Sequence, residues 1–383
     1  MHRKHPRITC RGSLIAICLS LTLGLFLTGA STASSGSASA ASHPIKTIDY
    51  ANFSDGSAFL KDFGNGFKNA AKVAGYTMKY YNNNLDGPTA IRNAQLMVQD
   101  KPDLIMEANA VAGVGNAIGK IFANSHIPCI SINVATPGCP LLNQINQAVG
   151  TSAAQAMAPF AKAAGDTGAN TTILLVQDAA AGTELNKCVT YFYATLANML
   201  PGFTKMTAPK ITLTTTKIGN TGVQVSATDL QSAYTAVKNV LPSIPSNRHL
   251  IVMVFSDPLA EGALRAITEA GRINTTLISG QGGGADGVHY LRTVKQWVIE
   301  PSVFNTTWSE LAMAMVKAYS DGVTLPPLTT VLQSVMTKQN VSQYYTASGT
   351  VYHLPPLSSA PPPGNAYLAK TGVLQKFHNV TGL

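Results

Sequence analysis

The sequence has little charge and none of the short motifs that mark common enzymes. Only 12% of its 383 residues are Asp, Glu, Lys or Arg, and no block of Lys or Arg stands out although the formal net charge is +9. We therefore expect neither nucleic acid nor a membrane surface as a partner. The chain has no Gly-x-Ser-x-Gly elbow, no His-Glu-x-x-His and no phosphate-binding loop, so we expect a protein that is not an enzyme. An exported hydrolase built from residues distant in the sequence is the alternative.

Cysteine is scarce as well. Two of the five cysteines lie within the first twenty residues, which leaves Cys129, Cys139 and Cys188 in the body of the chain. There is no Cys-x-x-Cys pair and no Cys/His cluster, so we predict neither structural zinc nor any cofactor. A bridge between Cys129 and Cys139 would close a short loop in an exported protein. Two thiols ten residues apart can equally point in different directions, so the sequence leaves this disulfide open.

The N-terminus indicates export. Basic residues between Arg3 and Arg11 precede an apolar run from Leu14 to Leu27, and small residues follow it. This layout predicts a signal peptide over residues 1–40, with an extracytoplasmic mature protein; an uncleaved membrane anchor is the rival reading. Removal of residues 1–33 takes away four positive charges and no negative one, which lowers the net charge from +9 to +5. No cysteine follows the apolar run closely, so we do not expect a lipid anchor.

The rest of the chain alternates strands with helices. About 340 residues remain after the signal peptide, which suggests two domains. One βα series runs from Ile45 to about Val134, and a second begins at Thr172. Strands separated by helices imply right-handed crossovers, so the predicted fold is α/β with two doubly wound parallel-sheet lobes. Prolines interrupt residues 341–383, and we interpret this C-terminal extension as extended or partly disordered.

Several short stretches follow one another in a set order along the two series. They are Phe53-Ser54-Asp55 with the helix that ends at Gly75-Tyr76, Lys101-Pro102-Asp103-Leu104-Ile105, Gly115-Asn116-Ala117-Ile118, Ala123-Asn124-Ser125-His126-Ile127-Pro128, Ala181-Gly182-Thr183, and the run FSDPLAEGALRA over residues 255–266. Together they resemble the substrate-binding proteins of sugar ABC transporters, of the ribose-binding type, over roughly residues 45–340. The run at 255–266 is the most specific part of the likeness.

The resemblance implies a type I periplasmic binding protein, whose lobes are joined by a three-crossing hinge and close on a ligand. By analogy, the N-terminal lobe would take residues 45–150 and 304–333. The C-terminal lobe would take 151–303 and 334–340. The implied partners are a small-molecule ligand, expected to be a sugar, and an ABC transporter permease, and we expect a monomer. A sensor that feeds a chemoreceptor or kinase is an alternative, as is a binding protein for a non-sugar metabolite.

Candidate ligand contacts in the first half follow the predicted strands, because ligands bind at the carboxyl ends of parallel strands. Phe53 and Phe59 could stack on a sugar ring, with Asp55 as a polar neighbour, although Phe59 could equally be a core position of its helix. Asn133 stands where the family usually has an Asp. It could donate to and accept from sugar hydroxyls, or it could be a turn residue.

Two positions in the second half depart from the family pattern. Cys188 stands where the family usually has an arginine, and we interpret it as a half-buried thiol, with Glu184 on the same turn as a possible replacement contact. Gln281 lies in a glycine-rich stretch where the family tends to have Asp. The glycines allow close approach of a ligand, and the stretch also matches a dinucleotide fingerprint formally, but it does not open a lobe as that fingerprint requires.

The remaining candidates follow later strands. Ser256 matches a position that contacts ligand in the family. Asp257 is a further candidate contact, although we favour a helix N-cap because Pro258 follows it. Phe304 could reach the cleft near the last crossing. These residues are mostly neutral hydrogen-bonding types, so we predict a neutral, hydroxylated ligand such as a sugar or polyol.

Overall fold

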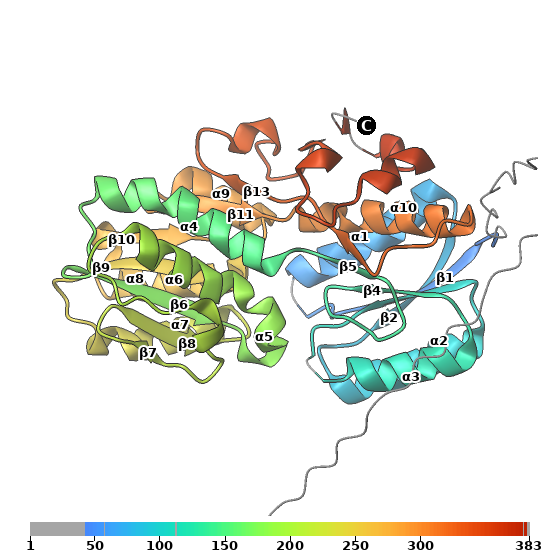
Figure 1. Ribbon diagram of the computed structural model, residues 1–383, viewed down its shortest axis with the longest axis horizontal. Helices are drawn as coiled ribbons and strands as arrows, with labels where there is room; N and C mark the ends of the chain where they lie inside the picture. The colour runs from blue at the N-terminus through green and yellow to red at the C-terminus, as the bar shows by residue number, and fades with distance from the viewer. Residues whose placement is uncertain (1–42, 57, 112, 378, 381–383) are drawn as a thin grey trace, which may run out of the picture. The chain divides into compact units, whose positions relative to one another are not determined.

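Two parallel sheets with their helices make up most of the described chain (Figure 1). The computed structural model describes residues 43–380 except 57, 112 and 378, and the side chain of Phe59 is not among the described ones. The predicted signal peptide lies outside the described residues. Within them, no helix combines the length and apolar character that a bilayer crossing requires.

The first sheet has six parallel strands in the order β12-β5-β4-β3-β1-β2. They are β1 (Thr47–Asn52), β2 (Thr77–Asn82), β3 (Leu104–Ala108), β4 (Cys129–Ile132), β5 (Leu141–Asn143) and β12 (Leu328–Thr330). The central strand β3 is buried along its whole length because helices cover both faces of the sheet. We call this sheet and its helices the N-terminal lobe.

Helices α1 (Ala58–Ala74) and α10 (Trp308–Ser320) pack together, as do α2 (Gly87–Asp100) and α3 (Gly115–Ser125). Helix α1 is amphipathic, because Phe63, Phe67 and Ala70 recur every three or four residues and are buried. Asp86 caps α2 by accepting a hydrogen bond of 2.8 Å from the Thr89 backbone N–H. The spacing of apolar residues therefore determines which face of α1 is buried, and the Asp86 cap determines where α2 begins.

The second sheet has seven strands in the order β13-β11-β10-β9-β6-β8-β7. They are β6 (Thr171–Gln177), β7 (Lys217–Ile218), β8 (Gly222–Ser226), β9 (His249–Val254), β10 (Thr276–Ser279), β11 (Trp297–Ser302) and β13 (Ser334–Met336). The five inner strands are parallel, and the edge strands β7 and β13 are antiparallel. This sheet and its helices form the C-terminal lobe.

The helices of the C-terminal lobe are α4 (Asn146–Ala163), α5 (Gly182–Leu185), α6 (Lys187–Met199), α7 (Leu230–Val240), α8 (Asp257–Glu269) and α9 (Ala285–Thr293). Helix α4 packs against α6 through Gly150, where a Cβ atom would lie 2.2 Å from the Cys188 carbonyl oxygen. Residue 150, where we expected the first segment of the N-terminal lobe to end, therefore lies inside a helix of the other lobe.

The chain passes between the two sheets three times. The crossings lie between β5 and α4, between β11 and α10, and between β12 and β13. Each sheet is therefore assembled from separate parts of the sequence. The predicted fold class, two α/β lobes with parallel sheets joined by three crossings, is confirmed.

The disulfide that the sequence left open is present. Cys129 and Cys139 are bonded, with their Cα atoms 5.0 Å apart. The bridge joins the first residue of β4 to the loop before β5, which contains Asn133. Cys188, expected to be half-buried, is a free thiol with 0% exposure.

The C-terminal extension is folded, contrary to our expectation. Its described part contains the short helices η6 (Val341–Gln343), η7 (Leu357–Ser359), η8 (Ala366–Thr371) and η9 (Leu374–Lys376), and a two-residue pairing of β14 (His353–Leu354) with β15 (Asn379–Val380). Leu354, Leu357, Leu368 and Leu374 are buried. These side chains join the main core and fix the segment without a regular period.

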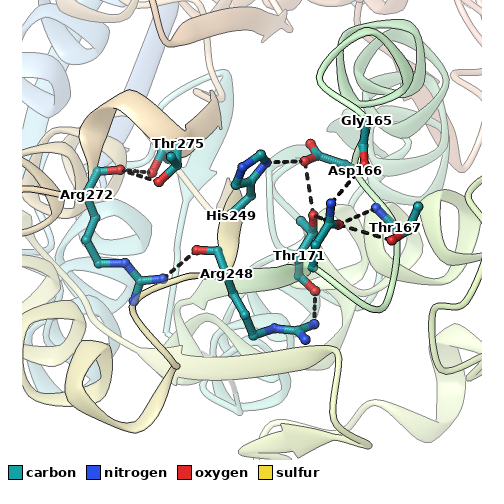
Figure 2. A network of polar contacts seen from close by, with 10 residues as sticks. Gly165, Asp166, Thr167, Thr171, Arg248, His249, Arg272 and Thr275 are labelled. Carbon is teal, nitrogen blue, oxygen red and sulfur yellow. Dashed lines mark hydrogen bonds and ion pairs between the residues drawn. The ribbon is translucent and has the colours of Figure 1, made fainter.

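A polar network ties together the amino ends of β6, β9 and β10 (Figure 2). Arg248 donates to the Thr172 hydroxyl and the Ala169 carbonyl, each at 2.8 Å, and its own carbonyl accepts from Arg272 at 2.7 Å. Asp166 contacts His249 Nδ1 at 2.7 Å. Ligands of parallel α/β sheets bind at the opposite, carboxyl ends of the strands, so we interpret this network as a scaffold.

Candidate functional site

The loop after β1 is built around Asn52, which is fully buried. Its side-chain amide donates to the carbonyls of Ser54 and Leu60, at 2.8 and 3.0 Å. Asp55 is exposed in this loop and accepts hydrogen bonds from the side chains of Tyr80 and Asn82. The carboxylate of Asp55 thus links the carboxyl ends of β1 and β2 and already has neutral partners.

Phe53 and Phe304 are core residues in this structure. Phe53 is 6% exposed and its ring packs on Phe63, with centroids 5.2 Å apart. Phe304 is 1% exposed and stacks on Tyr345 of the C-terminal extension, with centroids 5.9 Å apart. In this structure both rings therefore pack against other aromatic side chains of the protein.

A buried polar cluster after β2 and β3 was missed by the sequence analysis. Glu107 is 0% exposed; its Oε1 accepts from Asn83 at 2.9 Å, and Asn83 accepts in turn from Asn93. Among the described residues Glu107 Oε2 has no hydrogen-bond partner, and burial raises the pKa of this carboxyl well above its usual value. A glutamate inside an otherwise apolar strand was the signal that could have revealed it.

Asn133 lies at the end of β4 with a left-handed backbone, φ = 68°. Its backbone N–H donates to the Leu142 carbonyl at 2.9 Å, which fixes the turn. Its side chain is half-buried, and within the described part of the chain it makes no hydrogen bond. Both readings from the sequence are thus compatible with the structure: Asn133 forms a turn and offers a free carboxamide.

At the carboxyl end of β6, Asp178 and Asn186 hold the first loop of the C-terminal lobe. Asn186 Oδ1 accepts from the Asp178 backbone N–H at 3.0 Å, and Asp178 in turn caps the short helix η1 (Ala179–Ala181). Glu184 is exposed and forms an ion pair with Lys187 at 2.6 Å. The ionised groups of this loop therefore have partners already.

Asp257 is the first residue of α8, and Ser256 occupies the N-cap position. The predicted N-cap role of Asp257 is wrong, because its carboxylate accepts from the backbone N–H groups of Gln281 and Gly284, both at 2.9 Å. Burial raises the pKa of Asp257 to about 6. The Ser256 hydroxyl is half-exposed and, among the described residues, makes no hydrogen bond.

Glu300 supports the same glycine-rich loop from β11. It is fully buried, its Oε1 accepts from Gly283 at 3.0 Å, and its Oε2 accepts from Trp297 at 3.0 Å. Burial, together with the charge of nearby Asp257, raises the pKa of Glu300 well above its usual value. The carboxyl groups of Glu300 and Asp257 therefore both accept backbone hydrogen bonds from residues 281–284 and hold this loop in place.

Gln281 lies at the centre of this loop and is 4% exposed. Its side chain lies near the Cys188 thiol, and burial raises the pKa of that thiol to about 12, so the sulfur is neutral. In the described chain Gln281 Oε1 has no hydrogen-bond partner. Cys188 and Gln281, the two positions of the second half at which the sequence departs from the resembled pattern, are thus neighbours, and both carry neutral groups.

A cavity of about 390 Å³ borders the carboxyl ends of β6 and β8. Gln177 and Gln224 line it, and their amide nitrogens donate to carbonyls of the loop at 212–216. Nearly all its remaining lining is threonine and aliphatic side chains. It lies beside the strand ends that carry the candidate residues, at one edge of the C-terminal lobe.

The model of a family described as periplasmic binding protein domain matches residues 48–323. The chain belongs to the periplasmic binding protein family. The similar solved structures described next are solute-binding or periplasmic binding proteins of ABC transporters. No curated protein sequence matches it significantly.

Solved structures share the fold of this periplasmic binding protein at low identity. An ABC transporter solute-binding protein from Mycobacterium smegmatis with bound glycerol is 15% identical, with a TM-score of 0.66, over 80% of this chain and 99% of that one. The arabinose-binding component from Shewanella sp. ANA-3, bound to L-arabinofuranose, is 16% identical over 78% and 94%, with a TM-score of 0.64. A Bacillus halodurans protein with bound myo-inositol is 12% identical over 79% and 98%, with a TM-score of 0.61.

Proposed function

We propose that this protein captures a small, neutral, hydroxylated ligand between the carboxyl ends of its two sheets and delivers it to an ABC transporter permease outside the cytoplasm. The observation that carries the proposal is the presence of a free neutral hydrogen-bonding group at each edge. Within the described residues, the Asn133 carboxamide and the Ser256 hydroxyl have no partner. A carboxamide and a hydroxyl can both donate to and accept from ligand hydroxyls.

The ionised groups near the same edges support a neutral ligand. Asp257 is engaged by two backbone amides, Asp55 by Tyr80 and Asn82, and Glu184 by Lys187. A charged ligand would need an unengaged opposite charge to offset its desolvation. Gln281 and Cys188, which stand where the resembled family usually has Asp and Arg, are neutral and also support a neutral ligand.

The ligands of similar proteins agree with this chemistry. The structures described above contain glycerol, L-arabinofuranose or myo-inositol, all neutral polyhydroxyl compounds. Because those proteins are less than a fifth identical to this chain, they support the ligand class and not a particular sugar. The family and the predicted signal peptide support an extracytoplasmic location, and we propose a monomer that closes by a hinge motion.

The first test is a thermal-shift screen of the mature protein against sugars, polyols, amino acids and nucleosides. A ligand that binds only the folded state stabilises it by about 2.7 kcal/mol at a hundredfold excess over Kd. We expect shifts with sugars or polyols only. A shift confined to amino acids or nucleosides would overturn the ligand class and leave the fold assignment intact.

Calorimetry with the sugar or polyol that gives the largest shift then tests the two free groups. Asn133→Ala and Ser256→Ala should each weaken binding by about two- to tenfold, the value of one neutral hydrogen bond. Asn124→Ala and Ser358→Ala are matched controls, since both residues are exposed and their side chains make no hydrogen bond within the described chain. Equal affinity of all four variants would remove Asn133 and Ser256 from the site.

A further inference from the structure

We propose that the C-terminal extension is a fourth link between the two lobes and limits how far they open. The three crossings of the fold are complete at β13, which ends at Met336. The extension then contacts the C-terminal lobe first and the N-terminal lobe afterwards. The proposed restraint does not depend on which ligand binds, whereas its effect on affinity rests on the proposed function.

The first anchor joins the extension to the C-terminal lobe. Tyr345 is 1% exposed, its hydroxyl bonds the Ser302 hydroxyl at 2.5 Å, and its ring stacks on Phe304. Arg292 of α9 donates to the carbonyls of Tyr345, Thr346 and Ala347, at 2.9, 2.6 and 3.1 Å. The backbone and an aromatic side chain are both held, so this end of the extension is fixed.

This anchor also lies beneath the glycine-rich loop of the candidate site. A Cβ atom on Gly283 would lie 2.4 Å from the Tyr345 hydroxyl and 2.3 Å from the Ser302 hydroxyl. Gly283 has φ = 79°, which a side chain would also disfavour. The extension therefore packs directly against the segment that carries Gln281.

The second anchor joins the extension to the N-terminal lobe. Asn365 is fully buried and donates to the Thr330 carbonyl of β12 at 2.7 Å. The Thr330 hydroxyl donates to the Pro361 carbonyl at 2.8 Å, and the hydroxyls of Thr329 and Tyr367 bond at 2.8 Å. Helices η8 and η9 pack on α10. The extension therefore contacts both the edge strand β12 and helix α10 of this lobe.

A short connector separates the anchors. Residues 353–360 lie between Tyr352, whose backbone bonds Tyr344, and Pro361, and they could extend to at most about 29 Å. Leu354 and Leu357 within the connector are 2% and 4% exposed. Moving the anchors apart must therefore pull apolar side chains out of the core before the chain becomes taut.

The match to the family model ends at residue 323, so the extension lies outside the matched residues. A restraint on the open state reduces the conformational freedom that ligand-induced closure must remove. The link should therefore favour ligand capture.

The test is to cut the link after folding. A protease recognition sequence is inserted between Ser358 and Ser359, both exposed, in the full mature chain. Spin labels at Lys120→Cys on α3 and Gln231→Cys on α7 report the distance between the lobes, since Cys188 is buried and the other two described cysteines are bonded. Without ligand, cutting should broaden the distance distribution and add a longer-distance population that the uncut protein lacks.

Point variants test the second anchor while the extension stays uncut. Asn365→Ala should broaden the distribution in the same way, whereas Lys370→Ala, an exposed position on η8, should not. Glycerol or myo-inositol is the ligand probe, provided that the screen shows binding. Cutting should then raise the Kd of this probe by about three- to tenfold. An unchanged distribution after complete cutting would overturn the proposed restraint. Failure of every sugar in the screen would overturn the ligand proposal alone.

Discussion

Replacement of Glu107 by glutamine tests the electrostatics of the N-terminal lobe. The change keeps the shape of the side chain and the acceptor that receives the 2.9 Å hydrogen bond from Asn83. It removes the ability to ionise. Because burial raises the pKa of Glu107 well above 4.5 in the folded protein, the folded state holds a proton that the unfolded chain releases above about pH 4.5.

The sign of the effect follows from this difference. Where the folded state binds more protons than the unfolded state, the free energy of unfolding falls as pH rises, by about 1.4 kcal/mol per pH unit for one group. Glutamine lacks this dependence. The two proteins should therefore have similar stability near about pH 4.5, and Glu107→Gln should gain about 1.4 kcal/mol per pH unit over the wild type for as long as the folded glutamate keeps its proton.

Urea unfolding at half-unit steps from about pH 5 to about pH 8 measures this difference, with equal m-values as the check that both proteins unfold alike. Asp103→Asn is a control that should show no pH-dependent difference in this range. The backbone N–H groups of Thr47 and Lys46 lower the pKa of Asp103 from 3.8, so its contribution is fully present above pH 3.8 and is lost only at lower pH. A stability difference for Glu107→Gln that stays constant with pH, or that shrinks as pH rises, would refute the protonated, buried glutamate.

Two further predictions concern covalent and polar links. The Cys129–Cys139 bridge closes a loop of about ten residues and so lowers the entropy of the unfolded chain. The double variant Cys129→Ala/Cys139→Ala should therefore lose about 3 kcal/mol of unfolding free energy in denaturant titrations, and reductant should not destabilise it further. A loss of less than about 1 kcal/mol would contradict this stabilisation by loop closure. Asp257→Asn should lose about 1–3 kcal/mol, because an amide oxygen cannot replace a carboxylate that accepts from two backbone N–H groups. Faster hydrogen exchange at Gln281 and Gly284, measured by NMR, is the specific sign of that change.

The fold was largely predictable from the sequence because its signals are local. Alternating strands and amphipathic helices, such as the spacing of Phe63, Phe67 and Ala70, report burial of one face directly. The Cys129–Cys139 bridge was not predictable, because the orientation of two thiols depends on the path of the chain between them. The C-terminal extension was interpreted as extended or partly disordered because its leucines follow no period. The surface they pack against comes from elements far away in sequence.

The candidate site was predictable in location but not in detail. Asn133, Ser256 and Gln281 do lie at strand ends, as the topology requires, and their roles remain predictions. Phe53 and Phe304 turned out to face the core, since the direction of a side chain after a strand depends on the loop that follows. Asp257 serves a loop 24 residues away in sequence, a contact that no local pattern encodes.

The interleaved path of the chain has a consequence for biogenesis. The N-terminal lobe begins at β1 but needs α10, β12 and the anchor at Asn365, which come from the last fifth of the sequence. A nascent chain that ends before residue 308 lacks all three, so its first sheet keeps an open edge and an uncovered α1. Neither lobe can therefore fold completely before the end of the chain has been synthesised. The chain should remain a substrate for chaperones until its C-terminus has emerged.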